Sequence, residues 1–493
     1  MKRLALCLAL LFAVLPATAK EKKLHGYVTE VHSPTSFQID DVRITRDSAT
    51  SFEFEKEDDS DKSPVDFKAE DIRVGTELVV TGDLDEQTSE LRAKSIRVIL
   101  EDARKINRTA LMIWSPEMSR IGNGIWEGKF FADGQWIVVT ESTEVRFKPN
   151  KTERKALAKQ GKTQKAAAKA GDDGDDDDDD NTPGDLLNSL QSIGPDTFIT
   201  YEGVRLPDNT VLARKVEFMH NELEKSEFNM WRSVGVARHT PPNFKKRKAG
   251  DLEIANVGKF KIVPDENVQK YINWLGQRLI PHHQKNMPKD KPGKIPFFFF
   301  VVEGKGANAF ALPNGIVVIY SGMFELLENE AQLATVVGHE IAHAIQEHSW
   351  RQQNYHRKKL AAMRVAGTIA SIFGGAGGAG AAAATALFEG AIRSGYSRSL
   401  ENQADRSALE AMLAAGYDIR EAPRVWQLMS KAHGDGGTSF WSSHDNNTTR
   451  RSYLMAELRM NYPDANYKTL LTSKEQFEKY TAGLRALYAK KKK

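Results

Sequence analysis

Cysteine is almost absent from this sequence: Cys7 is the single cysteine among 493 residues. It lies in an apolar N-terminal run, and the preceding Leu6 is not the small residue that a lipid-attachment site requires. Removal of this run would leave no thiol in the chain. Disulfides and thiolate chemistry are therefore excluded from the folded protein, and any bound metal must have nitrogen and oxygen ligands.

An excess of charge of one sign is also lacking. The chain has 69 Lys and Arg against 66 Asp and Glu, which gives a formal net charge of +3. A dedicated nucleic-acid binder needs a clustered basic face to neutralise phosphates. We therefore expect no nucleic-acid partner.

The N-terminus has the pattern of an export signal. Basic Lys2 and Arg3 precede an apolar run from Leu4 to Leu15, and Pro16 and the small residues of Ala17-Thr18-Ala19 follow. A membrane anchor is the alternative, but the run is shorter than the ~20 apolar residues that cross a bilayer. We expect a signal peptide over 1–19 and a periplasmic protein, with release from the cell as the alternative.

Two small all-β modules are expected next, over 20–105 and 106–225. Short alternating apolar stretches are separated by Gly, Pro and Asp in both regions. The stretch from Val74-Gly75 to Val98 parallels the stretch from Ile193-Gly194 to Phe218, with a strand that ends in Gly82 or Gly203. This similarity indicates a weak internal repeat.

A charged insertion, 151–185, interrupts the second module. Its basic, Ala-rich beginning is followed by Asp172–Asp180, which is acidic except for Gly174. Such a run repels itself and has nothing to bury, so we expect a solvated, disordered loop. Calcium capture is the alternative, but the spaced ligands and distal Glu of a calcium loop are missing.

The composition changes to longer helical segments over 226–493. Apolar residues recur at helical spacing within Asp265–Leu279, and two runs of strand length, Phe297–Val302 and Ile316–Tyr320, follow and are expected to pair. The fold class is therefore predicted as α+β: a mainly helical domain with a small sheet, preceded by the two β modules.

The strongest chemical signal is His339-Glu340-Ile341-Ala342-His343, within a helix that is predicted from Asn329 onward. Four residues are just over one turn, so both imidazoles lie on one face and can reach one metal ion. Zinc suits such ligands, and Glu340 can take a proton from the attacking water and pass it to the leaving amine. Two surface histidines are the alternative, but apolar neighbours place this helix in a core.

Zinc needs a third protein ligand, and two sources are known. One class of zinc protease uses a His six residues after the second ligand, where this chain has Ser349. The other class uses a Glu from a later helix. Glu401 and Asp405 share a helical face, so Glu401 can bind the metal while Asp405 accepts a hydrogen bond from a ligand imidazole.

These motifs resemble the M48 family of zinc metallopeptidases over roughly Asp265 to Leu484. The family's HExxH and ExxxD helices match His339–His343 and Glu401–Asp405, Asn308–Pro313 resembles the stretch before the active-site helix, and Ser443-His444 with Arg450 resembles a C-terminal signature. Asp445 and Arg451 depart from that signature.

The resemblance implies a zinc-dependent endopeptidase of helices around a small sheet, with one Zn²⁺ per chain. His339, His343 and Glu401 are the expected ligands, Glu340 is the catalytic base, and Asp405 is a supporting acid beside the ligands. By the same similarity, His444 and Arg450 would lie near the metal, where they steady the oxyanion or regulate access.

Two segments have open interpretations. An extended peptide could add as a strand at Asn308, Ala309 and Phe310, held by main-chain hydrogen bonds that require little of the peptide's amino-acid sequence. The alternative is that this segment only packs under the helix. Val365–Phe388 has no charge and is mostly Ala and Gly. We expect helices or loops beside the active site there, with membrane contact as the alternative.

The predicted function is exported endoproteolysis in the quality control or processing of envelope proteins, with a protein or peptide substrate and peripheral contact with the membrane or envelope. One alternative is a chaperone-like or envelope-polymer-binding protein with a latent zinc site, against which the intact Glu340 argues. Another is hydrolysis of a non-protein amide, such as a cell-wall peptide. The sequence indicates no particular oligomeric state.

Overall fold

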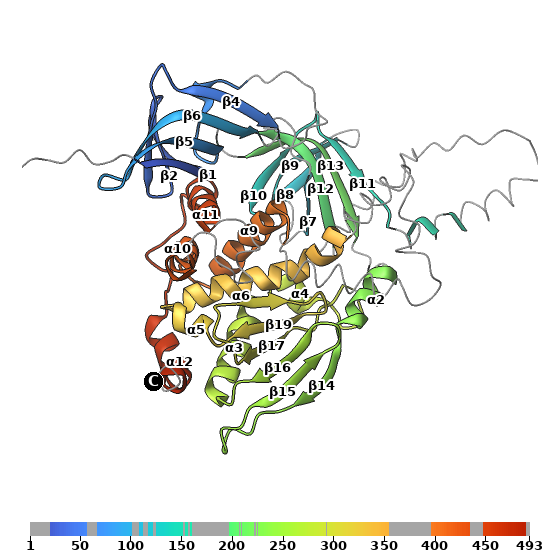
Figure 1. Ribbon diagram of the computed structural model, residues 1–493. Helices are drawn as coiled ribbons and strands as arrows, with labels where there is room; N and C mark the ends of the chain where they lie inside the picture. The colour runs from blue at the N-terminus through green and yellow to red at the C-terminus, as the bar shows by residue number, and fades with distance from the viewer. Residues whose placement is uncertain are drawn as a thin grey trace, which may run out of the picture. The chain divides into compact units, whose positions relative to one another are not determined.

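The computed structural model describes residues 20–56, 67–100, 108–111, 117–121, 125–150, 153–155, 158–159, 197–206, 208, 210–220, 223, 225–291, 293–353, 396–433 and 447–489. The chain forms two compact units, Met1–Leu100 and Glu101–Lys493. Strands predominate before residue 220 and helices after residue 262 (Figure 1). The predicted α+β class is confirmed.

The first unit is a six-stranded sheet of β1 (Lys20–Ser33), β2 (Ser36–Ile39), β3 (Val42–Thr45), β4 (Ser51–Lys56), β5 (Glu77–Asp85) and β6 (Glu90–Leu100). The strand order is β3-β2-β1-β5-β6-β4, and β3 also pairs with β6, so five of the strands close into a ring. Alternate side chains such as Val28, Ile39 and Val80 point inward and are fully buried.

The second unit begins with β7 (Arg108–Leu111), β8 (Glu117–Ile121), β9 (Ile125–Ala132), β10 (Gln135–Val139), β11 (Glu144–Phe147), β12 (Thr197–Arg205) and β13 (Val211–His220). The β9–β10 hairpin leads into a parallel pairing with β13, as the β2–β3 hairpin leads into one with β6. β11 pairs with β13 as β4 pairs with β6, and β12 and β13 form a hairpin as β5 and β6 do. The two sheets therefore share one strand plan.

A glycine marks the same irregularity in both hairpins. The register shifts between Thr81 and Gly82 in β5, and between Glu202 and Gly203 in β12. A Cβ would lie 2.1 Å from the Arg92 carbonyl oxygen at Gly82 and 2.5 Å from the Leu212 carbonyl oxygen at Gly203. Only glycine fits where the backbones approach this closely, which explains the repeated residue.

The remainder of the second unit contains a third sheet, of order β14-β15-β16-β17-β19-β18. Its strands are β14 (Val236–Thr240), β15 (Gly250–Ile254), β16 (Gly258–Ile262), β17 (Phe298–Val302), β18 (Ala309–Ala311) and β19 (Ile316–Tyr320). The predicted pairing of the two apolar runs is confirmed: β17 and β19 are parallel neighbours.

The helices of this unit are α2 (Lys225–Ser233), α3 (Glu266–Leu279), α4 (His282–Asn286), α5 (Met323–Leu326), α6 (Glu330–Ile345), α9 (Arg398–Ala414), α10 (Glu421–His433), α11 (Asn447–Asn461) and α12 (Lys474–Ala489). Figure 1 shows α6 between the third sheet and the helices α9 and α10. Covered on both sides, all of its residues are buried. Asn329 caps α6 by accepting a hydrogen bond from the Gln332 amide, which fixes the predicted start of this helix.

Several predictions fall outside the described residues: the signal peptide over 1–19, the acidic run Asp172–Asp180, the uncharged segment Val365–Phe388, and His444. Of the insertion 151–185, the structure describes residues 153–155 and 158–159. The Glu153 carboxylate lies 2.8 Å from Nδ1 of His220 on β13. Among the described residues, no helix has the length and apolar character needed to cross a membrane.

Candidate metal centre

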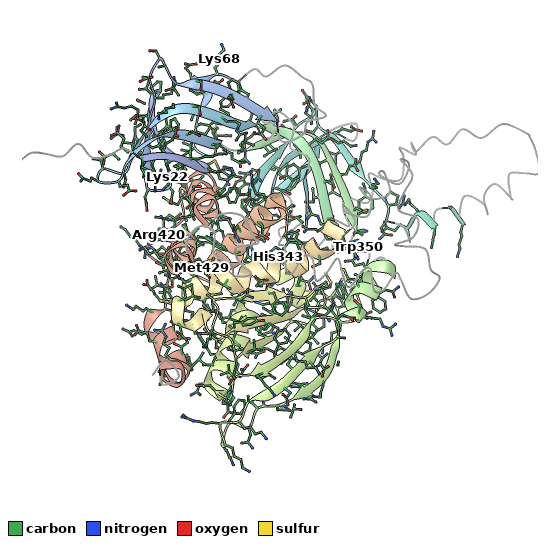
Figure 2. All side chains as sticks on the ribbon, in the orientation of Figure 1. Lys22, Lys68, His343, Trp350, Arg420 and Met429 are labelled. Atoms are coloured by element: carbon green, nitrogen blue, oxygen red, sulfur yellow. The ribbon has the colours of Figure 1, made fainter. Side chains whose placement is uncertain are left out.

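Helix α6 brings His339 and His343 together. The two residues are one turn apart, and their Nε2 atoms lie 2.9 Å from each other. Figure 2 shows His343 on α6 between the sheet and α9. Both imidazoles are buried, so their nitrogen atoms must find partners inside the protein.

Helix α9 packs on α6 and supplies Glu401. Its carboxylate oxygens lie 3.4 Å from Nε2 of His339 and 3.7 Å from Nε2 of His343. One ligand atom from each of these three residues lies within 4.8 Å of the others. Two imidazoles and one carboxylate converging on one point can hold a divalent metal ion.

Glu340 stands beside this cluster on α6. It is buried, and its Oε1 atom has no hydrogen-bond partner among the described residues. Burial raises the pKa of Glu340 to about 7, and the charge of Glu401 adds to the rise, while His339 and the Ala311 amide oppose it. An unpartnered carboxylate oxygen of near-neutral pKa beside three converging ligands fits a site that holds a metal and moves protons.

Asp405, one turn after Glu401, orients His339. Its Oδ1 atom lies 3.0 Å from Nδ1 of His339. Since Nε2 faces the other ligands, Nδ1 must carry the proton and donate it to Asp405. Burial and Arg450 lower the pKa of His339, but hydrogen bonds to Asp405 and Glu401 outweigh them and raise it to about 9.

Arg450 on α11 joins the two carboxylates of α9. Its Nη2 lies 2.6 Å from Oδ1 of Asp405, and its Nη1 lies 3.0 Å from Oε2 of Glu401. The guanidinium also stacks on Trp426, 3.6 Å from the ring centre. Although burial favours the neutral acid, Arg450 and His339 hold the pKa of Asp405 below its ordinary value.

A second chain of hydrogen bonds orients His343. Its Nδ1 lies 2.8 Å from Nδ1 of His348, whose Nε2 lies 3.0 Å from Oε1 of Gln403. With His343 Nε2 directed at the cluster, Nδ1 donates to a neutral His348, which in turn donates to Gln403. Burial and Arg351 lower the pKa of His348 well below its usual value, which keeps this ring neutral.

The predicted substrate segment lies at the edge of the third sheet. Asn308 accepts from the Tyr320 amide and Leu312 donates to Ile316, so both point toward β19. Alternation along an antiparallel strand then directs the main-chain groups of Ala309 and Ala311 away from β19. The Ala311 amide opposes the rise in the pKa of Glu340. The side chain of Phe310 is buried between Phe260 and Tyr320, and Ala309 and Ala311 are buried as well.

The structure thus brings together six of the predicted site residues: His339, Glu340, His343, Glu401, Asp405 and Arg450. Three residues near the site were not predicted from the sequence: Gln403, Trp426 and Tyr396. The ring of Tyr396 stacks on that of His343, with 4.1 Å between the ring centres. The position of Gln403 between Glu401 and Asp405 was the available signal for it. Nothing in the sequence singles out the two aromatic residues.

Comparison with known proteins agrees with this geometry. Residues 266–458 match the model of peptidase family M48, and residues 25–97 match a domain of unknown function, DUF5666. The beta-barrel assembly-enhancing protease of Escherichia coli K12 is 31% identical over 181 residues, which are 35% of this chain and 35% of that protein. The mitochondrial metalloendopeptidase OMA1 of Bos taurus is 31% identical over 206 residues, or 38% of each chain.

The mitochondrial metalloendopeptidase OMA1 of Arabidopsis thaliana is 31% identical over 165 residues, 33% of this chain and 32% of that protein. This chain therefore spans about one third of the length of these curated relatives. The match to the model of family M48, over residues 266–458, includes the metal centre.

Proposed function

We propose that the protein is a zinc-dependent endopeptidase that cleaves proteins or peptides, and the match of residues 266–458 to the model of peptidase family M48 supports this. The observation that carries the proposal is the convergence of His339, His343 and Glu401, with Glu340 beside them. A family likeness alone could survive the loss of activity. An intact ligand set and an intact base together support catalysis.

His339, His343 and Glu401 would hold the metal, and zinc fits them best. Two imidazoles and one carboxylate leave an open fourth position, as catalytic zinc sites require. When bound, zinc would polarise the scissile carbonyl and make water more acidic at neutral pH. Asp405 and His348 fix the orientation of the two ligand imidazoles.

Glu340 moves the proton. Its carboxylate accepts a proton from water as the water oxygen attacks the peptide carbonyl carbon, and it then returns this proton to the leaving nitrogen as the C–N bond breaks. A pKa of about 7 suits both steps, because the group can accept and release a proton near neutral pH. Arg450 and His444 would steady the oxyanion or regulate access, and Arg450 also neutralises the carboxylates of α9.

The substrate would bind as an extended strand along β18. The main-chain groups of Ala309 point away from β19 and would pair with a peptide backbone once the atoms that bury them are displaced, while Asn308 and Phe310 hold that edge in place through β19 and the core. Hydrogen bonds to the main chain of the substrate depend little on its amino-acid sequence. The enzyme would therefore accept unfolded segments of many proteins.

The setting we propose is the bacterial envelope, most simply the periplasm. The N-terminal sequence pattern supports export, and the E. coli relative is named for the assembly of beta-barrel proteins. The natural substrates would be envelope proteins that need processing or removal.

Zinc content and casein cleavage of the purified protein, beside Glu340→Gln, test the proposal. We expect one zinc per chain in both proteins and a loss of at least ~100-fold in cleavage rate for the variant, because the proton carrier is removed while the ligands remain. Glu328→Gln makes the same change at an exposed position just before α6 and should cleave normally. Parental cleavage by Glu340→Gln, or no zinc in either protein, would overturn the proposal.

A further inference from the structure

The face of α9 turned away from α6 contacts the second β module. The turn Asp133-Gly134, between β9 and β10, meets Arg406 and Glu410, which are one helical turn apart. Nη2 of Arg406 donates to Oδ2 of Asp133 at 2.7 Å, and its Nε donates to the Asp133 carbonyl at 2.8 Å. The Gly134 amide donates to the Glu410 carboxylate at 2.9 Å.

This contact is a fixed one. Asp133 is 0% exposed and Arg406 2% exposed, so neither charge can exchange its partner for water. The two turn residues have φ angles of 55° and 68°, the double left-handed conformation that an Asp-Gly pair favours in a two-residue hairpin. A Cβ at Gly134 would lie 2.8 Å from Cβ of Arg406, so the bare backbone is what allows the turn to reach the helix.

Arg406 directly follows Asp405, which orients His339, and Glu401 is little more than one turn earlier. An α-helix is stiff over this length, so two anchors at Arg406 and Glu410 fix both its rotation and its position along its axis. A small shift of α9 would move Glu401 relative to the two imidazoles of α6. Metal sites tolerate only a few tenths of an ångström in such distances.

We propose that the Asp133-Gly134 turn positions α9 for metal binding, with Asp133 and Arg406 as positioning residues of the peptidase. The turn lies between the two segments that match known families, 25–97 and 266–458, and neither match accounts for it. The second β module is then a structural part of the active site. This inference rests on the proposed function.

The test compares Asp133→Asn with the unmodified full-length protein. The substitution keeps the shape of the side chain and removes the charge that holds Arg406. We expect zinc affinity, measured by competition with a chelator, to fall by ~10-fold or more, as when groups that orient metal ligands are lost. The visible absorption of the cobalt-substituted protein should change, and kcat should fall while KM stays within ~2-fold, since β18 is untouched.

Two further variants serve as a control for Asp133→Asn and as a test of its partner. Asp208→Asn alters an exposed turn residue of the same sheet and should match the unmodified protein in every measurement. Arg406→Met should have the effect of Asp133→Asn, and the double variant should be no worse than either single variant, because both act through one pair. If Asp133→Asn fails to fold, Gly134→Ala displaces the turn with both charges intact and should weaken zinc binding.

The possible outcomes separate the two proposals. Normal zinc affinity, cobalt spectrum and kcat in Asp133→Asn and Arg406→Met, with only a lower melting temperature, would overturn the inference and leave the contact with a purely structural role. Absence of zinc binding and cleavage in the unmodified protein would overturn the proposed function itself.

Discussion

Arg450 is the residue on which the charge balance of the metal centre depends. It is 1% exposed and lies within 3.0 Å of both Glu401 and Asp405. Two carboxylates at this depth are stable as anions only beside a cation. In the metal-free protein, Arg450 provides a permanent cation, and His339, with its pKa raised to about 9, provides a second one.

We therefore expect Arg450→Met to lower the free energy of unfolding of the metal-free protein by about 3 kcal/mol or more, because it leaves two buried carboxylates beside one cation, His339, in place of two. Arg450→Lys should lose less unfolding free energy than Arg450→Met but remain less stable than the unmodified protein, since an ammonium cannot bind both acids as the guanidinium fork does. Urea denaturation in the presence of EDTA measures the effect. Arg420→Met removes the half-exposed partner of Asp418 and should cost under about 1 kcal/mol; an equal loss in both variants would contradict this account.

His283 on α4 makes stability depend on pH. Burial, with the neighbouring charges of His282 and Lys294, lowers its pKa to about 4, and neither ring nitrogen has a hydrogen-bond partner among the described residues. The unfolded chain, with an ordinary pKa of 6.5 at this position, binds a proton first as the pH falls. Stability from this group is complete above pH 6.5 and declines from there toward pH 4.

Replacement of His283 by Leu should remove this decline. Between pH 7.5 and pH 5.0 the unmodified protein should lose about 2 kcal/mol more unfolding free energy than His283→Leu. Denaturation curves at the two pH values in EDTA provide the comparison, and His239→Leu on the exposed strand β14 should behave as the unmodified protein does. Identical pH dependence in all three proteins would show that His283 is not buried in its neutral form.

Among the secondary-structure elements, β18 gives the clearest test of substrate binding. The Ala309 amide points away from β19, whereas the Phe310 amide points toward it, so a proline removes an outward donor at one position and a sheet hydrogen bond at the next. Ala309→Pro should raise KM for a peptide several-fold. Phe310→Pro should lower the melting temperature. An unchanged KM in a folded Ala309→Pro protein would exclude this edge as the binding site.

Local patterns predict what helices and strands dictate locally. His339 and His343 lie on one face because of helical spacing, and Asn329 begins the helix because its side chain can cap it. The prediction of Glu401 as a metal ligand needed one further premise, that zinc requires a third protein ligand beside the two histidines. By contrast, Asp133 and Arg406 are 273 positions apart, and no sequence pattern around either residue indicates that the two form a contact. Contacts of this kind depend on how whole elements pack, which the spacing of residues does not encode.

On the scale of the whole molecule, the two units differ in their relation to the chemistry. The first unit ends at Leu100, before every residue of the metal centre, and has its own buried core around Val28 and Val80. The second unit combines the other β module with the segment that matches peptidase family M48. The border between compact units therefore lies between two modules of the same strand plan.

That shared plan has an evolutionary reading. The first module has the turn Asp40-Asp41 where the second has Asp133-Gly134, and the leading aspartates have nearly the same φ, 56° and 55°. A duplicated ancestral module would leave this trace. Glycine at the second position of the turn is what lets the second module lie so close to α9, because any Cβ there would be 2.8 Å from Cβ of Arg406.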